Sequence, residues 1–264
     1  MEMLGYFAAL VMGAVLGLIG GGGSILTVPI LVYLLKVDAL SATGYSLFIV
    51  GLSACFGAYS YWKKGMVDFK TGAIFSVPAF LGVYLVRKFG VPMLPDVIVE
   101  INNWQMTKSF LILIVFALMM ILASISMIRG RKNAEGEKNK KFNYPLIALE
   151  GVVVGAFTGF VGAGGGFLII PALVVLAGLE MKVAVGTSLM IIAIKSLFGF
   201  IGDIQNNSAL DWQLLGLFTA IAVVGIFLGT LLSNKIPGDK LKPAFGWFVL
   251  IMGSFMILKE TLLA

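Results

Sequence analysis

The sequence has no histidine and a single cysteine, Cys55, among its 264 residues. Without histidine, the chain lacks the usual near-neutral proton carrier, the commonest metal ligand and the base of a Ser-His or Cys-His pair. One cysteine cannot form an internal disulfide, and in its apolar surroundings Cys55 is interpreted as a small buried hydrophobic side chain. We therefore expect no enzymatic activity, no cofactor and no bound metal.

Charge is scarce as well. Of all residues, 12% are charged and 59% are hydrophobic, whereas soluble domains are about 25% charged and about 45–50% apolar. The charge-free run 212–232 is long enough to cross a bilayer of roughly 30 Å as a helix. We expect the whole chain to be one membrane domain in contact with lipid. The first residues lack the basic region of a signal peptide, so the first hydrophobic segment is expected to remain in the mature protein.

The sequence contains an internal repeat. The stretch from Gly17 to Pro29 aligns with the stretch from Gly159 to Pro171, an offset of 142 residues (159 − 17). The register persists through Ala42, Gly44, Ser46 and Leu47, which fall on Ala184, Gly186, Ser188 and Leu189, and after one inserted residue Gly82 and Leu85 fall on Gly225 and Leu228. A repeat of this length predicts two related halves, 1–128 and 145–264, joined by a linker at 129–144.

Each half divides into five hydrophobic pieces, of which the second is short. The expected pieces are 4–19, 25–35, 39–61, 67–87 and 107–128, then 145–161, 167–178, 183–202, 212–232 and 245–262. At about 1.5 Å per residue, each short second piece covers about half of a bilayer.

The net charge of +6 comes from basic residues in short loops, which indicates membrane orientation and not nucleic-acid binding. Segment 129–141 has six Lys or Arg against two Glu, so we expect it in the cytoplasm. Counting from there places Lys63, Lys64 and 234–242 inside, and places 203–211, which has no Lys or Arg, outside. Corresponding loops thus exchange sides between the halves.

This exchange requires inverted halves with an odd number of crossings each. We therefore predict an all-α, polytopic protein of the cytoplasmic membrane with two inverted-topology repeats. Each repeat has a short broken or re-entrant helix pair plus three long transmembrane helices. Whether the short pieces span or re-enter stays open, and both arrangements place the two termini outside. A homodimer is also left open.

The glycine-rich breaks between the first and second pieces are candidates for a binding site. Non-helical backbone at membrane depth is tolerated only where protein buries it or it lines a wet cavity. A helix is expected to restart near Ser24 or Ile25 and near Gly166 or Phe167, and its unpaired amides and partial positive charge attract anions. Close helix packing through glycine is the alternative. The predicted substrate-binding residues here are Gly20, Gly21, Gly22, Gly23, Ser24, Gly162, Ala163, Gly164, Gly165 and Gly166.

Lys195 lies near the middle of the piece 183–202, where an unpaired cation costs a few kcal/mol or more. It needs an anionic partner, and we predict that the substrate supplies it. The alternative is that Lys195 snorkels or pairs with Asp203, which lies about 12 Å further along a helix.

Hydroxyl side chains early in the third piece of each half are further candidates. Ser46, Thr187 and Ser188, with Thr43, could donate to the same oxyanion. The alternative is a hydrogen bond back to a preceding carbonyl. Three prolines are assigned structural roles, namely Pro29, Pro171 and Pro78, the last as a kink in the fourth piece.

These residues resemble the sulfite exporter TauE/SafE family, also called the 4-toluenesulfonate uptake permease family. The resemblance covers nearly the whole chain and rests on three motifs, which are Gly17-x-x-Gly20-Gly-Gly-Gly-Ser24 with Pro29, Gly159-x-x-Gly162-Ala-Gly-Gly-Gly166 with Pro171, and Ala184-Val-Gly-Thr-Ser-Leu189. The first half departs from the last motif, because Tyr45 stands where the second half has Thr187. The family implies transport of sulfite, sulfoacetate or related sulfonates across the cytoplasmic membrane.

We expect export by alternating access, with the anion bound at the paired breaks near the midplane. An inside-negative potential favours exit of an anion by about 2.3 kcal/mol per charge per 100 mV, whereas uptake needs a coupling ion. Ion-coupled uptake of organosulfonates and a passive anion channel are the alternatives. An intramembrane enzyme is disfavoured, because the buried segments show no cluster of His, Asp and Glu.

Overall fold

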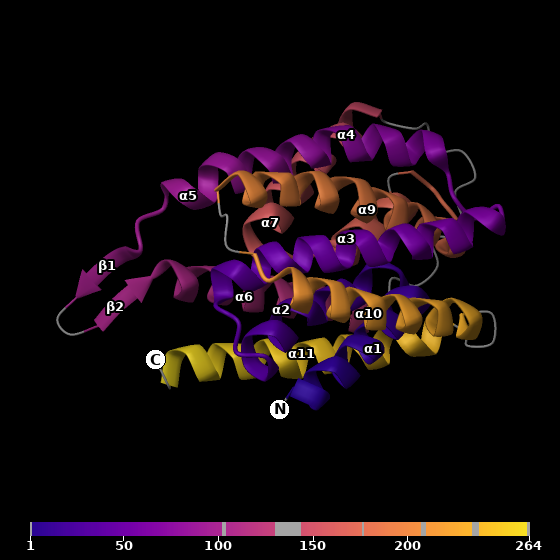
Figure 1. Ribbon diagram of the computed structural model, residues 1–264. Helices are drawn as coiled ribbons and strands as arrows, with labels where there is room; N and C mark the ends of the chain where they lie inside the picture. The colour runs from indigo at the N-terminus through magenta and orange to yellow at the C-terminus, as the bar shows by residue number, and fades with distance from the viewer. Residues whose placement is uncertain are drawn as a thin grey trace.

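The computed structural model describes residues 2–101, 104–129, 144–175, 177–206, 210–233 and 238–262, and these are mostly helical. The helices of the first half form a bundle with those of the second (Figure 1). The first half contains α1 Glu2–Ile19, η1 Gly21–Leu26, α2 Thr27–Pro29, η2 Ile30–Leu34, α3 Ala39–Lys63, α4 Phe69–Leu85, η3 Val86–Gly90, α5 Val91–Met93 and α6 Lys108–Arg129. The second half contains α7 Tyr144–Val161, α8 Gly166–Val175, α9 Met181–Asn206, α10 Trp212–Leu232 and α11 Gly238–Leu262.

The lengths and composition of the helices are those of an integral membrane protein, as predicted. Within the described residues, five helices are long and apolar enough to cross a membrane, namely Ala39–Lys63, Phe69–Met93, Lys108–Ile125, Met181–Gln205 and Trp212–Leu232. Shorter apolar helices occupy Met3–Ile19, Gly21–Leu34 and Pro145–Val161. Every hydrophobic piece expected from the sequence corresponds to a helical segment.

Aspartates fix where several helices begin. Asp38 accepts hydrogen bonds from the amides two and three residues further on, at 3.0 and 3.2 Å, at the start of α3. Asp68 does the same for α4 at 3.0 and 3.1 Å, and Asp211 accepts from the amide of Leu214 at 2.9 Å in α10. Such caps satisfy amides that have no partner inside the helix and so define its first turn.

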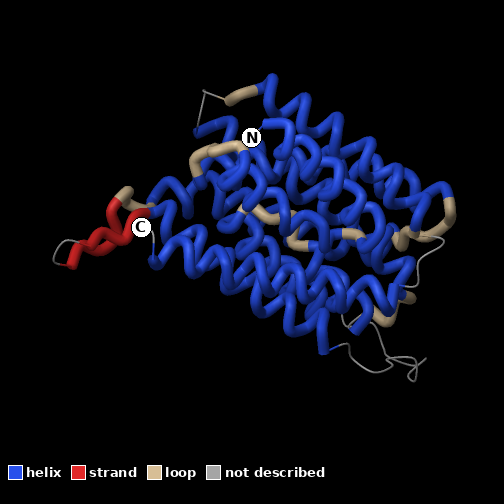
Figure 2. Tube along the Cα trace, turned by 90° about the horizontal axis from the view of Figure 1, so that it is seen from below, coloured by secondary structure: helices blue, strands red, loops and turns tan. Residues whose placement is uncertain are grey.

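A small β-hairpin, β1 Val97–Ile101 and β2 Trp104–Thr107, interrupts the helical pattern. Its antiparallel strands pair Val99 with Met106 and Glu100 with Gln105. The hairpin, red in Figure 2, projects from one end of the bundle, which we call the hairpin end. The hairpin lies between the expected pieces 67–87 and 107–128 and is an exception to the helical fold, because the β-branched run at 97–101 favours an extended chain. The opposite end, where α6 ends and α7 begins, is called the linker end.

The central helices α3 and α9 are the most enclosed of the five long ones. They run antiparallel, because Gly44 lies against Asp203, Gly51 against Leu197 and Gly57 against Leu189. Around them, α1 packs on α10, α7 packs on α4, and α6 packs on α11.

Glycine allows the close approach of the outer helix pairs. A Cβ at Gly13 of α1 would collide with the Ala222 carbonyl of α10, and one at Gly155 of α7 would collide with the Ala79 carbonyl of α4. Small residues permit such backbone contact between membrane helices, where lipid supplies no hydrophobic drive for association.

In both halves the chain turns back within the bundle at its glycine-rich break. Gly20 has a φ of 76°, and the segment after it returns until Leu35 lies against Gly5 near the start of α1. In the second half, Gly162 and Gly165 have φ values of 73° and 68° between α7 and α8. Positive φ values of this size are readily adopted only by glycine. We call residues 20–24 the first tip and residues 162–166 the second tip.

Candidate anion site

The two tips meet inside the protein. All ten of their residues are buried. A Cβ at Gly21 would collide with the Cα of Gly166, and a Cβ at Gly164 would lie 2.8 Å from the Cβ of Ser24. The ten predicted site residues of the breaks are therefore brought together in space, although the two breaks are far apart in the sequence. Their role in binding an anion stays a prediction.

Each tip also lies against the early turns of a central helix. A Cβ at Gly20 would lie 3.0 Å from Cγ1 of Val185 and 3.1 Å from Oγ of Ser188, both in α9. Gly162 contacts Thr43 in α3 so closely that any Cβ would collide with it. The hydroxyl-bearing turns singled out in the sequence thus border the tips, Ser188 at the first and Thr43 at the second.

The helix that follows the second tip begins directly at the glycines. The amides of Leu168 and Ile169 both donate to the Gly165 carbonyl, at 3.0 and 3.1 Å. The amides of the residues before them belong to the first turn, where no carbonyl of the same helix is available. At the first tip the helix restarts at Gly21, earlier than expected, and Ser24 Oγ donates to the Gly21 carbonyl at 2.6 Å.

Lys195 is fully buried and lies at the second tip. Its Nζ donates to Oγ1 of Thr158 at 2.7 Å and lies 3.4 Å from the position of a Cβ at Gly165. Thr158 in turn donates to the Gly155 carbonyl at 3.3 Å. In the part of the chain that the structure describes, no carboxylate lies within ion-pair distance of Nζ. The ammonium therefore neither reaches solvent nor pairs with Asp203.

The candidate hydroxyls differ in how they are used. Ser188 Oγ donates back to the Val185 carbonyl at 2.8 Å, and Thr43 Oγ1 donates to the Leu40 carbonyl at 2.7 Å, the bonding considered as the alternative. Ser46 Oγ is buried, and among the described residues it has no hydrogen-bond partner. Of Ser188, Thr43 and Ser46, the hydroxyl of Ser46 is thus the one that no described residue uses.

Thr187 has a structural partner that the sequence did not reveal. Its Oγ1 accepts a hydrogen bond of 2.9 Å from the amide of Asp68, the residue that caps α4. Tyr45, at the corresponding position of the first half, accepts one of 2.9 Å from the amide of Asp211, which caps α10. Tyr45 and Thr187 thus have the same role in the two halves. Tyr45 joins α3 to the start of α10, and Thr187 joins α9 to the start of α4.

The three prolines lie within helical segments. Pro29 is buried in α2, in the middle of the short return segment, and Pro171 lies in α8. The helix α4 continues through Pro78, whose Cβ lies 3.5 Å from the position of a Cβ at Gly151 of α7. A kink at Pro78 stays a prediction.

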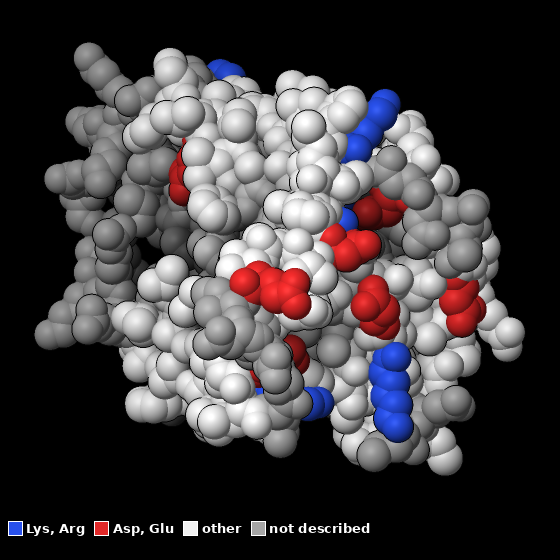
Figure 3. Space-filling view, turned by 90° about the vertical axis from the view of Figure 1, so that its left-hand side faces the viewer, with Lys and Arg blue, Asp and Glu red and all other residues white. Residues whose placement is uncertain are grey.

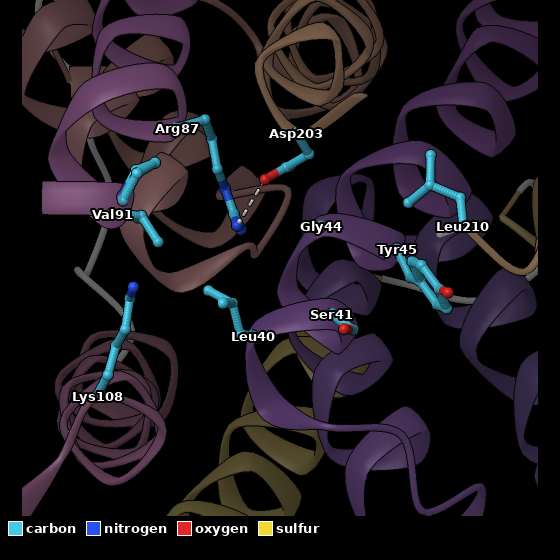
Figure 4. Close-up of a pocket in the computed structure, with 10 residues that line it drawn as sticks. Leu40, Ser41, Gly44, Tyr45, Arg87, Val91, Lys108, Asp203 and Leu210 are labelled. Carbon is cyan, nitrogen blue, oxygen red and sulfur yellow. Dashed lines mark hydrogen bonds and ion pairs between the residues drawn. The ribbon is translucent and has the colours of Figure 1, made fainter. Parts of the chain in front are cut away.

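A cavity of about 330 Å³, with charged and apolar side chains in its lining, opens at the hairpin end, and we call it the mouth cavity. Figure 4 shows its polar side chains, with Arg87 and Asp203 facing each other. Arg87 Nη1 lies 3.3 Å from Asp203 Oδ1, and the exposed fractions of the two side chains are 0% and 18%. The other polar lining residues are Ser41, Tyr45 and Lys108.

Sequence reasoning missed this cavity. Arg87 was the last residue of the expected piece 67–87, where an arginine reports only a membrane boundary. The helical segment in fact continues to Met93, which places Arg87 inside the bundle. The available signal was the apolar run from Phe89 to Met93, which lets the helical segment continue past Arg87 and Lys88.

The described residues contain no group of three His, Cys, Asp or Glu side chains that could hold a metal ion. Instead, short broken helices meet around an enclosed ammonium in an apolar bundle. This arrangement is typical of membrane transporters, where irregular backbone at depth surrounds the bound solute. Residues 5–256 match the profile of the family described as sulfite exporter TauE/SafE, and the chain belongs to this family.

Curated relatives carry matching descriptions. "Probable membrane transporter protein" of Xylella fastidiosa (strain 9a5c) is 31% identical over 253 residues, which cover 93% of this chain and 90% of the relative. "Probable membrane transporter protein YdhB" of Bacillus subtilis is 25% identical over 242 residues, 92% of this chain and 94% of the relative. "Probable membrane transporter protein MJ0441" of Methanocaldococcus jannaschii is 24% identical over 270 residues, 94% of both chains. No solved structure matches the chain. The chain is accordingly a membrane transporter, and the family resemblance found in the sequence is confirmed.

Proposed function

We propose that this protein carries small sulfur-containing anions, such as sulfite, sulfoacetate or related sulfonates, out across the cytoplasmic membrane. The anion binds where the two glycine tips meet and is released on the other side by alternating access. The description of the family as sulfite exporter supports the substrate class, and the meeting of the two tips supports the site.

The buried ammonium of Lys195 is the observation that carries this proposal. An enclosed cation is costly in a membrane interior unless an anion or several hydrogen bonds accompany it. Thr158 accepts one hydrogen bond from Lys195, and the nearby amides at the start of α8 can donate to an anion or to a neutral acceptor. Ammonium and amides together favour an oxyanion placed between them.

Inverted repeats would give such a site two-sided access. The antiparallel course of α3 and α9, which are corresponding helices of the two halves, supports inversion. The packing of the outer helices supports inversion as well. The first helix of each half packs on the fourth piece of the other half, α1 on α10 and α7 on α4. In this arrangement the two short helix pairs are re-entrant and their tips approach the middle from opposite sides.

The two ends of the bundle differ in packing, as expected for a carrier in a conformation that is open to one side of the membrane. At the hairpin end, Gly44 lines the mouth cavity. At the linker end, its counterpart Gly186 is covered, because a Cβ there would collide with the Met66 carbonyl and lie 2.9 Å from Cβ of Tyr61. With segment 129–141 in the cytoplasm and both termini outside, the open side is the outer one.

Transport in proteoliposomes tests the proposal. Vesicles loaded with sulfite, sulfoacetate or chloride are compared at imposed potentials of both signs, with protein-free vesicles as background. We expect saturable flux of the sulfur anions that accelerates when the potential drives anions out. Flux that needs a sodium or proton gradient would assign coupled uptake instead, and single-channel currents would assign a pore.

A matched pair of glycine variants tests whether the anion flux depends on the contact between the two tips. Gly166→Ala places a methyl group on the backbone of Gly21, whereas Gly216→Ala on the exposed face of α10 meets nothing within 4 Å. We expect the first variant to lose at least tenfold in sulfite flux and the second to match the wild type. Normal flux in Gly166→Ala, or no flux of any sulfur anion in the wild type, would contradict the proposed site.

A further inference from the structure

The mouth cavity combines positive charge with enclosure. Arg87 comes from the helix end beyond α4, Lys108 from the start of α6, and Asp203 from the end of α9. Two cations and one carboxylate leave a formal charge of +1 on the lining. Lys108 Nζ points toward the cavity in Figure 4 and donates to the Leu94 carbonyl at 3.1 Å, which holds the ammonium in place.

Acidic residues at the surface of this end do not neutralise these cations. Figure 3 shows Asp and Glu side chains gathered on the hairpin end. Asp38 and Asp211 both cap helices, so part of their charge is offset by the amides and the positive ends of α3 and α10. Glu100 accepts from Nε2 of Gln105 at 3.0 Å in the β-hairpin. Arg87 and Lys108 thus lie in the lining of the cavity beneath an acidic surface, with Asp203 as the carboxylate in contact with Arg87.

The carboxylate of Asp203 is held in an unusual way. Its Oδ1 pairs with Arg87, whereas its buried Oδ2 has no hydrogen-bond partner among the described residues. The carboxylate lies flat against Gly44, where a Cβ would be 3.2 Å from both Cγ and Oδ2. A buried charge with an unused oxygen is weakly held, so a second anion at Arg87 competes with it.

The remaining walls of the cavity are apolar. Leu40, Val91 and Leu210 line it beside the charged groups, and Ser41 and Tyr45 add hydroxyls. A volume of about 330 Å³ lies at the small end of the usual range for ligand pockets, about 300–1,000 Å³. Cations beside branched apolar side chains match a small organic anion, with its charged group at Arg87 and Lys108.

We propose that the mouth cavity is a second anion-binding site, separate from the glycine tips, which takes a small organic anion between Arg87 and Lys108. Its ligand has one oxyanion group and one compact apolar group. Asp203 is the internal competitor that sets the affinity of the site, because the ligand and this carboxylate share Arg87. The proposal stands on the cavity alone and does not depend on binding at the tips.

Equilibrium binding of benzenesulfonate to the purified full-length protein, measured by titration calorimetry, tests the site. The titrations are made in a Lys195→Met background, which disables the proposed site at the tips and isolates the mouth cavity. We expect one benzenesulfonate per chain, with affinity reduced at least tenfold by Lys108→Gln. The glutamine can still donate to the Leu94 carbonyl, so the variant removes charge with little loss of structure.

The variant Asp203→Asn is expected to raise the affinity for benzenesulfonate, which would not happen if the Arg87–Asp203 ion pair had only a structural role. The amide oxygen can still accept from Arg87, but the competing negative charge is gone, so benzenesulfonate should bind tighter by on the order of tenfold. Lys36→Gln, at an exposed residue of the same end, is the matched charge control and should change affinity less than twofold. Thermal unfolding of each variant shows whether it is folded.

Three results would overturn the inference. One is loss of all binding in Lys195→Met, since that would place the ligand at the tips only. Another is an affinity that neither Lys108→Gln nor Asp203→Asn changes. The third is displacement of bound benzenesulfonate by dihexanoyl phosphatidylglycerol at a concentration below that of benzenesulfonate, which would assign the cavity to lipid headgroups.

Discussion

Replacing Lys195 by methionine separates function from stability. Methionine has nearly the length and volume of lysine, so it fills the same space in α9 without the charge. A lysine at the centre of a membrane helix costs about 2.5–3.5 kcal/mol, and a hydrogen bond to a charged group offsets about 1.5–3 kcal/mol of that cost. Lys195 has one such bond, to Thr158, and Thr158 keeps its own bond to Gly155 after the replacement.

The balance of these terms predicts that Lys195→Met is as stable as the wild type or more stable by about 1 kcal/mol. In a protein of this size, 1 kcal/mol corresponds to about 2–4 °C in Tm. Anion flux should nevertheless fall at least tenfold, because the site loses its only enclosed cation among the described tip contacts. A ligand present at 100 times its Kd stabilises the folded state by about 2.7 kcal/mol. Sulfite should therefore raise the Tm of the wild type by several degrees more than that of Lys195→Met.

The assays are thermal unfolding in detergent, with and without sulfite, and sulfite flux in proteoliposomes. Ser53→Ala is the control, because Ser53 is the counterpart of Lys195 in the first half and its hydroxyl is buried without a partner among the described residues. That variant should be neutral in both assays. If Lys195→Met unfolds several degrees below the wild type yet carries sulfite normally, Lys195 is a structural cation and the reasoning fails.

Two further predictions concern the frame around the site. Tyr45→Phe leaves the part-buried amide of Asp211 without its acceptor and should lower the free energy of unfolding by about 1 kcal/mol. A change below 0.3 kcal/mol in thermal unfolding would show that the contact is dispensable. In a chain without Cys55, cysteines at Lys36 and Lys182 should be labelled by impermeant maleimide from opposite sides of the membrane, with Lys63 labelled from the same side as Lys182. Labelling of Lys36 and Lys182 from one side would contradict inversion of the halves.

The helices were largely predictable because the bilayer restricts what a hydrophobic run can be. An apolar segment of about 20 residues has few alternatives to a helix, so the piece 212–232 coincides with α10 at both ends. The ends of other helices were less well placed. The expected piece 67–87 ends at Arg87, whereas the helical segment continues through Lys88 and the apolar residues after it to Met93. A charge marks a membrane boundary only if it reaches water, and burial against Asp203 prevents this here.

The candidate site was predictable to the extent that it depends on backbone. Glycine runs reveal where the chain leaves the helix, and the repeat indicates that two such places belong together. The sequence could not reveal hydrogen bonds between distant segments. Thr187 looked like a ligand-binding hydroxyl, and only the fold shows that its acceptor lone pair serves the amide of Asp68. Contacts of this kind depend on the register between helices, which a run of apolar residues does not specify.

Comparison of the two halves separates the residues that shape the site from those that give it charge. The glycines of the two tips recur at matching positions and produce similar turns, with positive φ at both Gly20 and Gly162. The charged residues at the second tip and in the mouth cavity do not recur, although the capping residues Asp68 and Asp211 do. Lys195 corresponds to Ser53, and in the mouth cavity Asp203 corresponds to Tyr61, which donates to the Gly17 carbonyl at 3.2 Å. The shared residues thus build a frame that either half could supply, whereas the unshared Lys195, Arg87 and Asp203 place charged groups at one tip and at one end. An anion that crosses such a frame meets unequal surroundings on its two sides, so substrate choice is expected to depend on the unshared residues and the conformational change on the shared ones.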